Sequence, residues 1–370
     1  MALAISNVCN TDCLMCWSHS PLLKRQKLNG TGKPSARPPA QSFMDPQLFE
    51  TIIREARAMG TFRVVLGGEG EPTLHPRFDD MLLLMTELRM EPYVLTNGLG
   101  VDEARASTWA ASRAHFRFSL HAGDEETWMR VHPSGRPGQF QHISGVIKSL
   151  VQAERPAVST THVIHRANYR HVRSMVEHAH ELGVREILFR PVRVGGLVTE
   201  LVEDSVGEPE RRRRLNTDPR VAELVLDRDE EAELRRLLKS GLELSERYGI
   251  RTNLRQYLAD NLHIQAGVLH TEEVYQRIPC YMGWIYAEFD VDGTMRPCLH
   301  SEIAMGLAGQ QPIRDIWRSP RYRRFRRQAI TMPRRRALVD GCHCSSCCMV
   351  KYNTNVHNLL HLKSLDYGAP

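Results

Sequence analysis

The 370-residue sequence lacks any long apolar run, and no stretch approaches the roughly 18–20 residues that cross a bilayer. Its first residues, MALAISNVCNTDC, also lack the basic start and extended apolar segment of a secretory signal. Internal repeats and long low-complexity tracts are missing as well. We therefore expect a globular, cytoplasmic protein with no membrane partner, in which thiols remain reduced.

Cysteine is scarce, and the nine cysteines form an odd number that suits a disulfide framework poorly. Three of them, Cys9, Cys13 and Cys16, lie within the eight residues CNTDCLMC. Three thiols cannot complete a tetrahedral metal site, so either a distant fourth ligand joins them or one coordination position stays open. A structural zinc site completed from elsewhere in the chain is one reading of this triplet.

The formal net charge of +6 is concentrated in three arginine-rich runs, at 211–214, 321–327 and 334–336. We interpret these runs as solvent-exposed helix faces and a loop. No RRM, KH or helix-turn-helix signature accompanies them, which disfavours nucleic acid as a partner. An acidic redox partner or a phosphate-bearing substrate is the alternative reading.

Strand-like and helix-like segments alternate through the first half of the chain. The segment 45–60, for example, predicts a helix with Asp45 as N-cap and Pro46 at the first helical position. Six such units predict an α/β fold with a parallel sheet covered by helices. Residues 18–43, rich in Pro, Gly and Lys, are expected to form an exposed insertion. The expected strands are 2–6, 62–68, 92–98, 115–121, 157–164 and 185–191.

The strand HFRFSLH (115–121) indicates how the sheet is curved. Its alternation places the two phenylalanines on one side and Arg117, Ser119 and His121 on the other. A parallel strand buried on both faces should be apolar throughout. The polar side therefore indicates a barrel-like interior that holds a ligand.

The chain is longer than a single hydrophobic core usually supports, so we expect more than one domain. Residues 1–195 should form the barrel core. Residues 196–279 are expected to be a charged and largely helical extension, in which 229–250 is the clearest helix. Residues 280–370, which contain the remaining six cysteines, should form a second domain.

The cysteine triplet resembles, in its spacing and its place after the first strand, the signature of the radical S-adenosylmethionine (radical SAM) superfamily. The resemblance implies a partial (β/α)6 barrel and a [4Fe–4S] cluster held by Cys9, Cys13 and Cys16. It also implies that the open iron binds the amino and carboxylate groups of SAM. The reduced cluster would then cleave SAM to a 5′-deoxyadenosyl radical, which abstracts hydrogen from the substrate.

Two further motifs fall where this resemblance requires them. GGEGEP (67–72) follows the second strand, as does the superfamily's GGEP-like motif, and TNG (96–98) ends the third. The resemblance implies that glycines let the backbone approach the methionine of SAM and that a glutamate accepts from its ammonium group. Positions at the next two strands would contact ribose or adenine, although ordinary barrel packing is the alternative there. The residues concerned are Gly68, Gly70, Glu71, Asn97 and Ser119.

The C-terminal cysteines follow a second pattern. Cys280 and Cys298 flank a predicted hairpin with a DG turn, and CHCSSCC (342–348) follows about 45 residues later. The arrangement resembles the SPASM/twitch extension of radical SAM enzymes, a small β-hairpin and helix domain with one or two auxiliary clusters. We expect one auxiliary [4Fe–4S] cluster, because Cys342 and Cys348 cannot supply four ligands to another. Two clusters with three cysteines each, zinc, or a different choice within CHCSSCC remain alternatives. The expected ligands are Cys280, Cys298, Cys344 and Cys347.

The fate of the substrate radical decides the reaction. Loss of a proton and an electron gives oxidation, return of hydrogen from a thiol gives epimerisation, and loss of a neighbouring group gives elimination or decarboxylation. An auxiliary cluster favours oxidation, whereas Cys342 or Cys348 as hydrogen donor would permit epimerisation.

We expect no leader-recognition domain before the barrel, which favours a small hydroxylated substrate such as a sugar, aminocyclitol or nucleoside in natural-product (antibiotic) biosynthesis. The alternatives are a ribosomal peptide or protein side chain and, in a different class, a zinc-stabilised nucleic-acid-binding protein. A flavodoxin- or ferredoxin-type protein is the expected reductant. Substrate-binding candidates near strand ends are His121, His162, Arg190 and Arg193.

Overall fold

The structure is a computed structural model, and it describes most of the chain. Arg193 and Cys348, both named above, lie outside the described residues. The described residues are 1–16, 18–22, 43–153, 155–192, 196–203, 209–216, 223–259, 264–265, 268–269, 271–301, 303–342, 344, 347 and 349–361.

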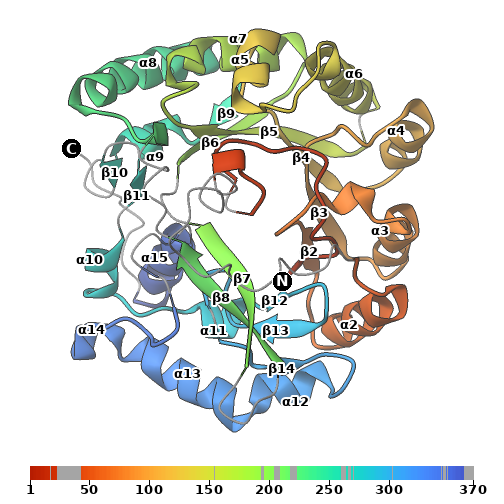
Figure 1. Cartoon of the computed structure of the whole chain (residues 1–370), viewed down its shortest axis with the longest axis vertical. Helices are drawn as coiled ribbons and strands as arrows, with labels where there is room; N and C mark the ends of the chain where they lie inside the picture. The colour runs from red at the N-terminus through yellow and green to blue at the C-terminus, as the bar shows by residue number, and fades with distance from the viewer. Residues whose placement is uncertain are drawn as a thin grey trace.

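One ten-stranded sheet organises the molecule, in the order β14-β13-β12-β1-β2-β3-β4-β5-β6-β9. The strands from β1 to β6 are parallel and pair in chain order, so the six expected strand–helix units and the partial barrel are confirmed. Figure 1 shows the sheet curving around the interior with helices outside it. The parallel strands are β1 (Ala2–Leu3), β2 (Arg63–Leu66), β3 (Glu91–Thr96), β4 (His115–Ser119), β5 (Ala157–Ile164), β6 (Glu186–Pro191) and β9 (Arg251–Thr252).

The outer helices form as their sequences predict. Asp45 caps the first of them by accepting from the backbone N–H groups of Gln47 and Leu48 at 2.9 and 3.0 Å, and Pro46 occupies the first turn. Their apolar stripes pack on the sheet. The helices of this layer are α2 (Pro46–Ala58), α3 (Phe78–Glu87), α4 (Glu103–Ala110), α5 (Glu125–Val131), α6 (Gln139–Gln152), α7 (Val172–Glu181) and α8 (Arg228–Arg247), with short turns η1 (Pro72–Leu74) and η2 (Tyr169–His171).

Alternation in β4 separates the core from the barrel interior. Phe116 and Phe118 are fully buried, and Phe116 stacks on Trp109 of α4 with ring centroids 4.7 Å apart. Arg117 and Ser119 point to the opposite side and are only half-buried. The polar inner side expected for this strand is therefore present.

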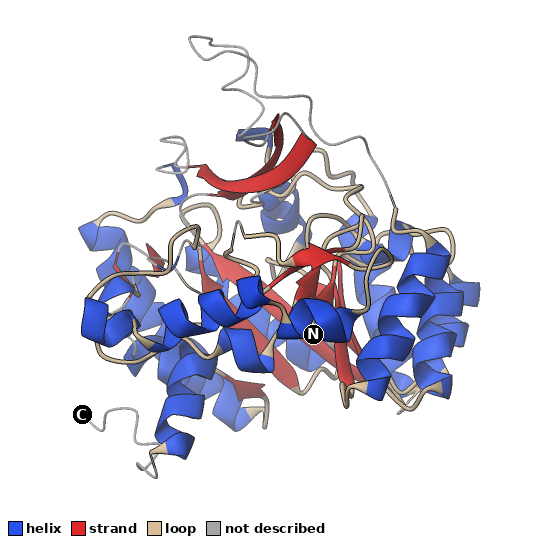
Figure 2. Ribbon diagram, turned by 90° about the horizontal axis from the view of Figure 1, so that it is seen from below, coloured by secondary structure: helices blue, strands red, loops and turns tan. Residues whose placement is uncertain are grey.

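Residues 196–216 differ from the largely helical extension expected for 196–279. They contain an antiparallel hairpin of β7 (Gly196–Glu203) and β8 (Pro209–Asn216), in which Glu200 lies opposite Arg212. The helix expected at 229–250 does form, as α8, with a capping box at Asp227. The run LVTELVE in β7 is rich in β-branched residues, which favour strands. Figures 1 and 2 place the hairpin over one mouth of the barrel, and it follows the carboxyl end of β6.

The C-terminal region continues the same sheet. β12 pairs in parallel with β1, with Ala2 opposite Glu288, and it forms the predicted hairpin with β13, whose turn contains Gly293 at φ 85°. The expected domain divisions at 195/196 and 279/280 stay a prediction. The elements that follow β9 are α9 (Leu254–Ala259), β10 (Ile264–Gln265), β11 (Val268–Leu269), α10 (Glu272–Tyr275), α11 (Met282–Ile285), β12 (Glu288–Phe289), β13 (Thr294–Arg296), β14 (Gly306–Leu307), α12 (Ile313–Arg318), α13 (Pro320–Ile330), α14 (Met332–Arg335) and α15 (Val350–Leu360).

Within the described ranges, no helix has the length and apolar character that crossing a membrane requires.

Candidate active site

The three N-terminal cysteines lie in one loop at the carboxyl end of β1. The hydroxyl of Thr11 is 3.4 Å from Cys9 Sγ and 3.5 Å from Cys13 Sγ. Cys16 Sγ accepts from the backbone N–H groups of Ser18 and His19 at 3.4 and 3.2 Å. The loop therefore gathers the thiols among hydrogen-bond donors.

Burial raises the pKa of each of these three thiols, and the Cys16 thiol raises the pKa of Cys13 further. Crowded and buried thiols of this kind resist ionisation in the metal-free chain. A bound cationic cluster would remove that cost, because metal coordination deprotonates a thiol. The donor set therefore fits an iron–sulfur cluster. In the part of the chain that is described, no three His, Cys, Asp or Glu side chains form a compact set for a single metal ion.

The end of β3 fixes one side of this loop. Asn97 Nδ2 donates to Asn10 Oδ1 at 2.7 Å and lies 3.9 Å from Cys9 Sγ. Asn97 Oδ1 accepts from the backbone N–H of Leu99 at 2.9 Å, which orients the amide. The side chain expected to contact SAM therefore also positions the cysteine loop.

The end of α5 fixes the other side. Asp12 Oδ1 accepts from both the backbone N–H and the hydroxyl of Ser134, at 2.9 and 2.6 Å. Leu14 N donates to Val131 O at 2.9 Å. Sequence reasoning missed these residues, because no motif links positions 122 residues apart.

The glycines of GGEGEP allow a close approach, and its partner is the cysteine-bearing segment itself. A Cβ added to Gly70 would lie 2.6 Å from Val8 N and would collide with Val8 O. Glu71 N donates to Val8 O at 2.8 Å. Gly68 has φ 142°, and an added Cβ would lie 3.0 Å from the Cβ of Ala4. The motif loop thus packs directly on the chain leading to Cys9.

The carboxylate of Glu71 accepts four hydrogen bonds within the chain. Its Oε1 accepts from Thr73 N, Thr73 Oγ1 and Thr96 Oγ1 at 3.1, 2.7 and 2.7 Å, and its Oε2 accepts from Asn97 N at 2.7 Å. Burial raises the pKa of this carboxyl, whereas the four donors act in the opposite direction. These contacts hold the carboxylate against the motif loop and the end of β3. The expected contact with the ammonium group of SAM stays a prediction, because Oε2 accepts only one of these hydrogen bonds.

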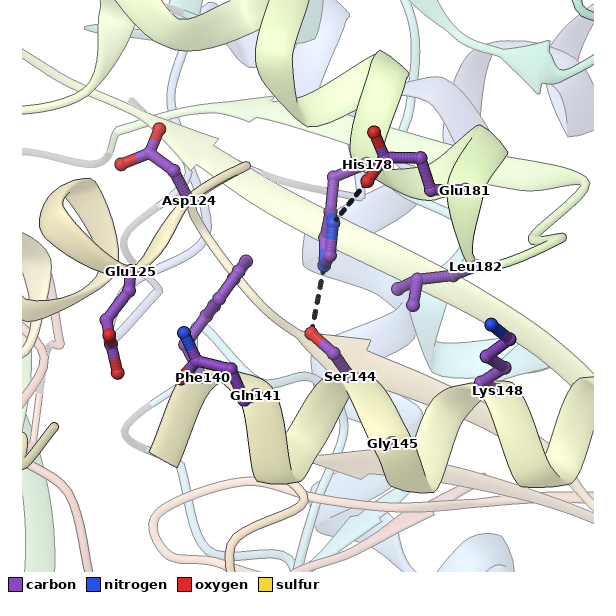
Figure 3. A pocket seen from close by; sticks show the side chains of 10 residues that line it. All are labelled: Asp124, Glu125, Phe140, Gln141, Ser144, Gly145, Lys148, His178, Glu181 and Leu182. Carbon is purple, nitrogen blue, oxygen red and sulfur yellow. Dashed lines mark hydrogen bonds and ion pairs between the residues drawn. The ribbon is translucent and has the colours of Figure 1, made fainter. Parts of the chain in front are cut away.

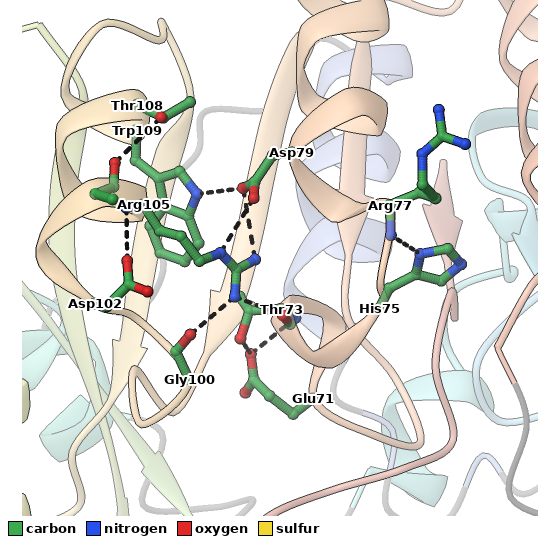
Figure 4. Close-up of polar contacts among 11 residues, drawn as sticks. Glu71, Thr73, His75, Arg77, Asp79, Gly100, Asp102, Arg105, Thr108 and Trp109 are labelled. Atoms are coloured by element: carbon green, nitrogen blue, oxygen red, sulfur yellow. Dashed lines mark hydrogen bonds and ion pairs between the residues drawn. The ribbon is translucent and has the colours of Figure 1, made fainter.

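Arg105 of α4 secures the same loop from outside the barrel. Its guanidinium donates to Thr73 O and Gly100 O at 2.9 and 2.8 Å and pairs with Asp79 at 3.1 Å. Trp109 Nε1 also donates to Asp79, at 2.9 Å. Figure 4 shows this network connecting α3 and α4 to the motif that contacts the cysteine loop.

Ser119 and His121 mark the end of β4. Ser119 lies opposite Thr161 of β5 on the interior side of the sheet. His121 adopts φ 59°, and its Nδ1 accepts from Val163 N at 3.1 Å, so the ring proton resides on Nε2. Burial, with neighbouring histidines adding to it, holds the pKa of His121 well below its usual value. The imidazole is therefore neutral and able to donate one hydrogen bond.

His162, a substrate-binding candidate near a strand end, faces the outer helices. Ser159 of the same strand faces Arg117 inside the barrel, so alternation directs His162 to the helices. Its ring stacks on Phe189 with centroids 5.5 Å apart, and burial lowers its pKa to about 3. Arg190 is exposed at the carboxyl end of β6, opposite Val163, and remains a candidate.

The auxiliary cysteines also come together. Tyr275 Oη donates to Cys347 Sγ at 3.1 Å, and Met349 N donates to the same sulfur at 3.3 Å. Burial raises the pKa of the Cys280 and Cys298 thiols, and the Cys347 thiol raises both further. Cys342, which is half-buried, lies 3.4 Å from Ser301 Oγ and beside Cys344, so it belongs to the same group of thiols. The cysteines of this group are Cys280, Cys298, Cys342, Cys344 and Cys347.

Comparison with known families now identifies both halves of this geometry. Residues 3–179 match the radical SAM superfamily, and residues 280–356 match the iron–sulfur cluster-binding SPASM domain. Together they cover about two thirds of the chain. The chain belongs to the radical SAM superfamily. This radical SAM enzyme accordingly uses SAM with a SAM-binding [4Fe–4S] cluster and carries an auxiliary-cluster domain.

Three known proteins illustrate its similarities. A probable GTP 3′,8-cyclase of Methanosarcina mazei is 24% identical over 228 residues, which are 61% of this chain and 58% of the cyclase. A PqqA peptide cyclase of Methylocella silvestris is 23% identical over 323 residues, 82% of this chain and 75% of that protein. The structure of anSMEcpe with bound AdoMet and Cp18Cys peptide has a TM-score of 0.58 at 13% identity, over 98% of this chain and 96% of that one. This last likeness shows the fold.

A separate cavity of about 530 Å³ lies among α5, α6 and α7 of this radical SAM enzyme (Figure 3). There His178 Nε2 is 2.9 Å from Ser144 Oγ, and His178 Nδ1 is 3.4 Å from Glu181 Oε2. The order resembles a nucleophile, a base and an orienting acid. Ser144 is inside α6, however, where backbone N–H groups bond within the helix and cannot stabilise an oxyanion. The trio is therefore a structural contact between two helices.

Proposed function

We propose that this radical SAM enzyme oxidises a hydroxyl-bearing carbon of a small polar substrate, such as a sugar, aminocyclitol or nucleoside. When bound, SAM and its cluster supply the 5′-deoxyadenosyl radical that removes hydrogen. Cys9, Cys13 and Cys16 would hold the SAM-binding cluster. The auxiliary cluster would be held by Cys280, Cys298, Cys344 and Cys347.

The observation that carries this proposal is the pairing of β1 with β12. Ala2 N donates to Ala287 O and Ala4 N donates to Phe289 O, each at 2.9 Å. β1 leads into the cysteine triplet, and β12 lies between Cys280 and Cys298. The two sets of cysteines therefore lie next to neighbouring strands of one sheet. This supports an electron acceptor beside the barrel, which oxidation requires.

Epimerisation has weaker support, because it needs a thiol that returns hydrogen to the substrate. Cys342 lies among the auxiliary thiols and contacts Ser301, rather than lining the barrel beside Ser119. Cys348 is outside the described residues. Elimination and decarboxylation require no auxiliary acceptor, so the β1–β12 pairing does not favour them.

Residues at the carboxyl ends of the strands suit a polar substrate. The hydroxyl of Ser119 faces the interior and can hydrogen-bond a substrate hydroxyl. His121 offers its Nε2–H from a neutral ring, and its anchored Nδ1 fixes the direction of that donor. The exposed guanidinium of Arg190 suits a carboxylate or phosphate. We propose these three side chains as the substrate-binding set.

A ribosomal peptide is the second candidate substrate. The similarity to a PqqA peptide cyclase spans 82% of the chain and reaches both the barrel and the C-terminal region. The β7–β8 hairpin over the barrel mouth contains Arg211 to Arg214, whose charge suits an acidic peptide. Peptide modification would use the same cysteine triplet and the same auxiliary site.

Anaerobic turnover in D2O tests the proposal. The reconstituted enzyme is given SAM, dithionite and panels of aminocyclitols, sugars, nucleosides and precursor peptides encoded nearby. We expect a small-molecule product two hydrogens lighter than its substrate. Deuterium at carbon with no change in oxidation state would establish epimerisation instead, and a modified peptide would establish the second candidate.

Two sets of variants locate the chemistry. Alanine at Cys9, Cys13 and Cys16 should abolish 5′-deoxyadenosine formation and remove about half of the roughly eight irons expected for two cubane clusters. Alanine at Cys280 and Cys298 should remove the other half and leave SAM cleavage. Undiminished cleavage in the first variant would contradict the assignment of the triplet.

A further inference from the structure

A strongly basic surface covers the C-terminal domain. Helices α12, α13 and α14, together with the residue that follows α14, expose nine arginines between residues 314 and 336, which we call the basic face. In the described residues, none of these guanidinium groups takes part in a salt bridge. So much uncompensated charge of one sign creates a field that attracts an acidic partner. The basic face consists of Arg314, Arg318, Arg321, Arg323, Arg324, Arg327, Arg334, Arg335 and Arg336.

The helix at the centre of this surface is packed directly on the auxiliary thiol site. Cys280 N donates to Ala329 O of α13 at 3.2 Å. Arg326 Nε donates to Gly283 O at 2.7 Å, just beyond Cys280. Tyr322 is fully buried, and its pKa is raised by burial and by the nearby Cys298 thiol. A single helix therefore separates the basic face from the auxiliary cysteines.

Exposed apolar side chains lie on α13 and on α11, the short helix packed against it. Trp284, Ile285 and Ile330 are 42%, 50% and 43% exposed. They belong to α11 and α13, which contact each other so closely that a Cβ on Gly283 would lie 2.8 Å from Phe325 Cε1. An exposed Trp on a helix packed against an arginine-rich helix is typical of a protein interaction site.

We propose that the basic face, with Trp284 beside it, docks a small acidic electron-carrier protein of the flavodoxin or ferredoxin class. The auxiliary cluster would take one electron from the substrate radical as that radical loses a proton, and would pass this electron to the oxidised cofactor of the carrier, which is thereby reduced; no covalent bond of this chain changes. The inference rests on the proposed function, since it requires a redox-active auxiliary site. The positive charge of the basic face complements an acidic carrier. Because α13 packs on the auxiliary thiols, a carrier docked there would lie close to the auxiliary cluster. A nucleic acid could also bind the arginines, but its binding would not require the auxiliary cysteines to lie behind α13.

Direct binding tests this proposal without relying on turnover. The full-length, anaerobically reconstituted enzyme is titrated with an acidic flavodoxin at 50 and 200 mM NaCl, and Kd is measured by calorimetry. Arg321, Arg324 and Arg327 are changed together to Glu. The matched control changes Arg113, Arg155 and Arg185 to Glu; these exposed residues precede β4, β5 and β6. Each triple variant lowers the formal net charge from +6 to zero.

We expect the wild-type Kd to rise with salt and the basic-face variant to bind at least about tenfold more weakly at 50 mM NaCl. The control should stay within about twofold. Trp284→Ala, which leaves the charge unchanged, should weaken binding about tenfold. Iron content and circular dichroism of each variant verify that the fold and clusters are intact.

Three results would overturn the docking site. Equal weakening in both triple variants would show a nonspecific effect of net charge. No flavodoxin binding, together with tight binding of a labelled oligonucleotide that the basic-face variant loses, would identify a nucleic-acid surface. Substrate oxidation with dithionite in an enzyme that binds no flavodoxin would reject the docking site alone. Salt-dependent flavodoxin binding without any substrate oxidation would reject only the proposed function.

Discussion

Asn97 at the end of β3 donates its side-chain amide to Asn10 at 2.7 Å, which joins the third strand of the barrel to the loop that contains the cysteine triplet. The same amide lies 3.9 Å from Cys9 Sγ. A residue at a strand end thus holds the loop of a proposed cluster ligand through one hydrogen bond.

Asn97→Asp should loosen the N-terminal cluster. The carboxylate keeps an acceptor for Leu99 N but loses the donor to Asn10 and puts negative charge beside Cys9. A lost hydrogen bond of this kind costs about 1.5–3 kcal/mol when charge is involved, so we expect SAM cleavage to fall at least about tenfold. The measurements are 5′-deoxyadenosine formation and iron per chain. Asn253→Asp is the control, because Asn253 makes the same two kinds of contact with Phe189, away from the cysteines.

Gly70→Ala should displace the cysteine loop. The added Cβ would meet the backbone of Val8, which cannot rotate away as a side chain would. We expect loss of about half the iron and nearly all SAM cleavage, with the auxiliary iron retained. Gly145→Ala in α6 is the matched control, since its Cβ would meet nothing within 4 Å. Full iron content in Gly70→Ala would refute the packing argument.

Arg296→Met should destabilise the auxiliary domain. Arg296 Nε lies 2.9 Å from Asp290 Oδ2, and the side chains are only 0% and 3% exposed. Removing one partner strands a buried charge, which costs about 3–5 kcal/mol. Urea unfolding should show this loss, and the auxiliary iron should decrease. Arg251→Met, whose pairing with Glu186 is exposed, should cost less than about 1 kcal/mol.

Buried histidines should make the fold sensitive to acid. Burial lowers the pKa of His162 and of His165 to about 3, whereas an unfolded histidine titrates near 6.5. Below pH 6.5 the unfolded chain therefore binds more protons, and stability falls as the pH falls towards 3. Each histidine should remove about 2 kcal/mol between pH 7 and pH 5.

The His162→Phe variant tests this prediction, because it keeps a ring against Phe189 and removes the titrating group. Urea unfolding at pH 7 and pH 5 should show a pH dependence reduced by about 2 kcal/mol. His180→Phe, at an exposed position of α7, should leave the wild-type dependence unchanged. An unaltered dependence in His162→Phe would show that another group carries it.

Local sequence patterns predicted the structural features that are determined by neighbouring residues. The cap and apolar stripe of α2, the alternation of β4 and the spacing of the cysteine triplet could all be read directly, because each is fixed within a few residues. The hairpin at 196–216 could not, since its arginine-rich strand lacks the alternation of a half-buried strand and suits an exposed helix equally well.

Contacts between segments that are distant in sequence could not be predicted from local patterns. The pairing of β1 with β12 joins residues nearly 290 positions apart, and Asp12 meets Ser134 without any shared motif. The orientation of His162 is a related case. Its position near a strand end was visible, but its side of the sheet follows from the partners of Ser159 on a neighbouring strand.

The two-residue strand β1 has hydrogen-bonding neighbours on both sides, β2 and β12. The terminal amine just before it donates to Arg63 O at 3.1 Å. The two cysteine-bearing regions thus share this one short strand, and a change that breaks its hydrogen bonds would disturb both regions together. The proposed oxidation, which needs two metal centres in fixed register, would thereby depend on a strand of only two residues.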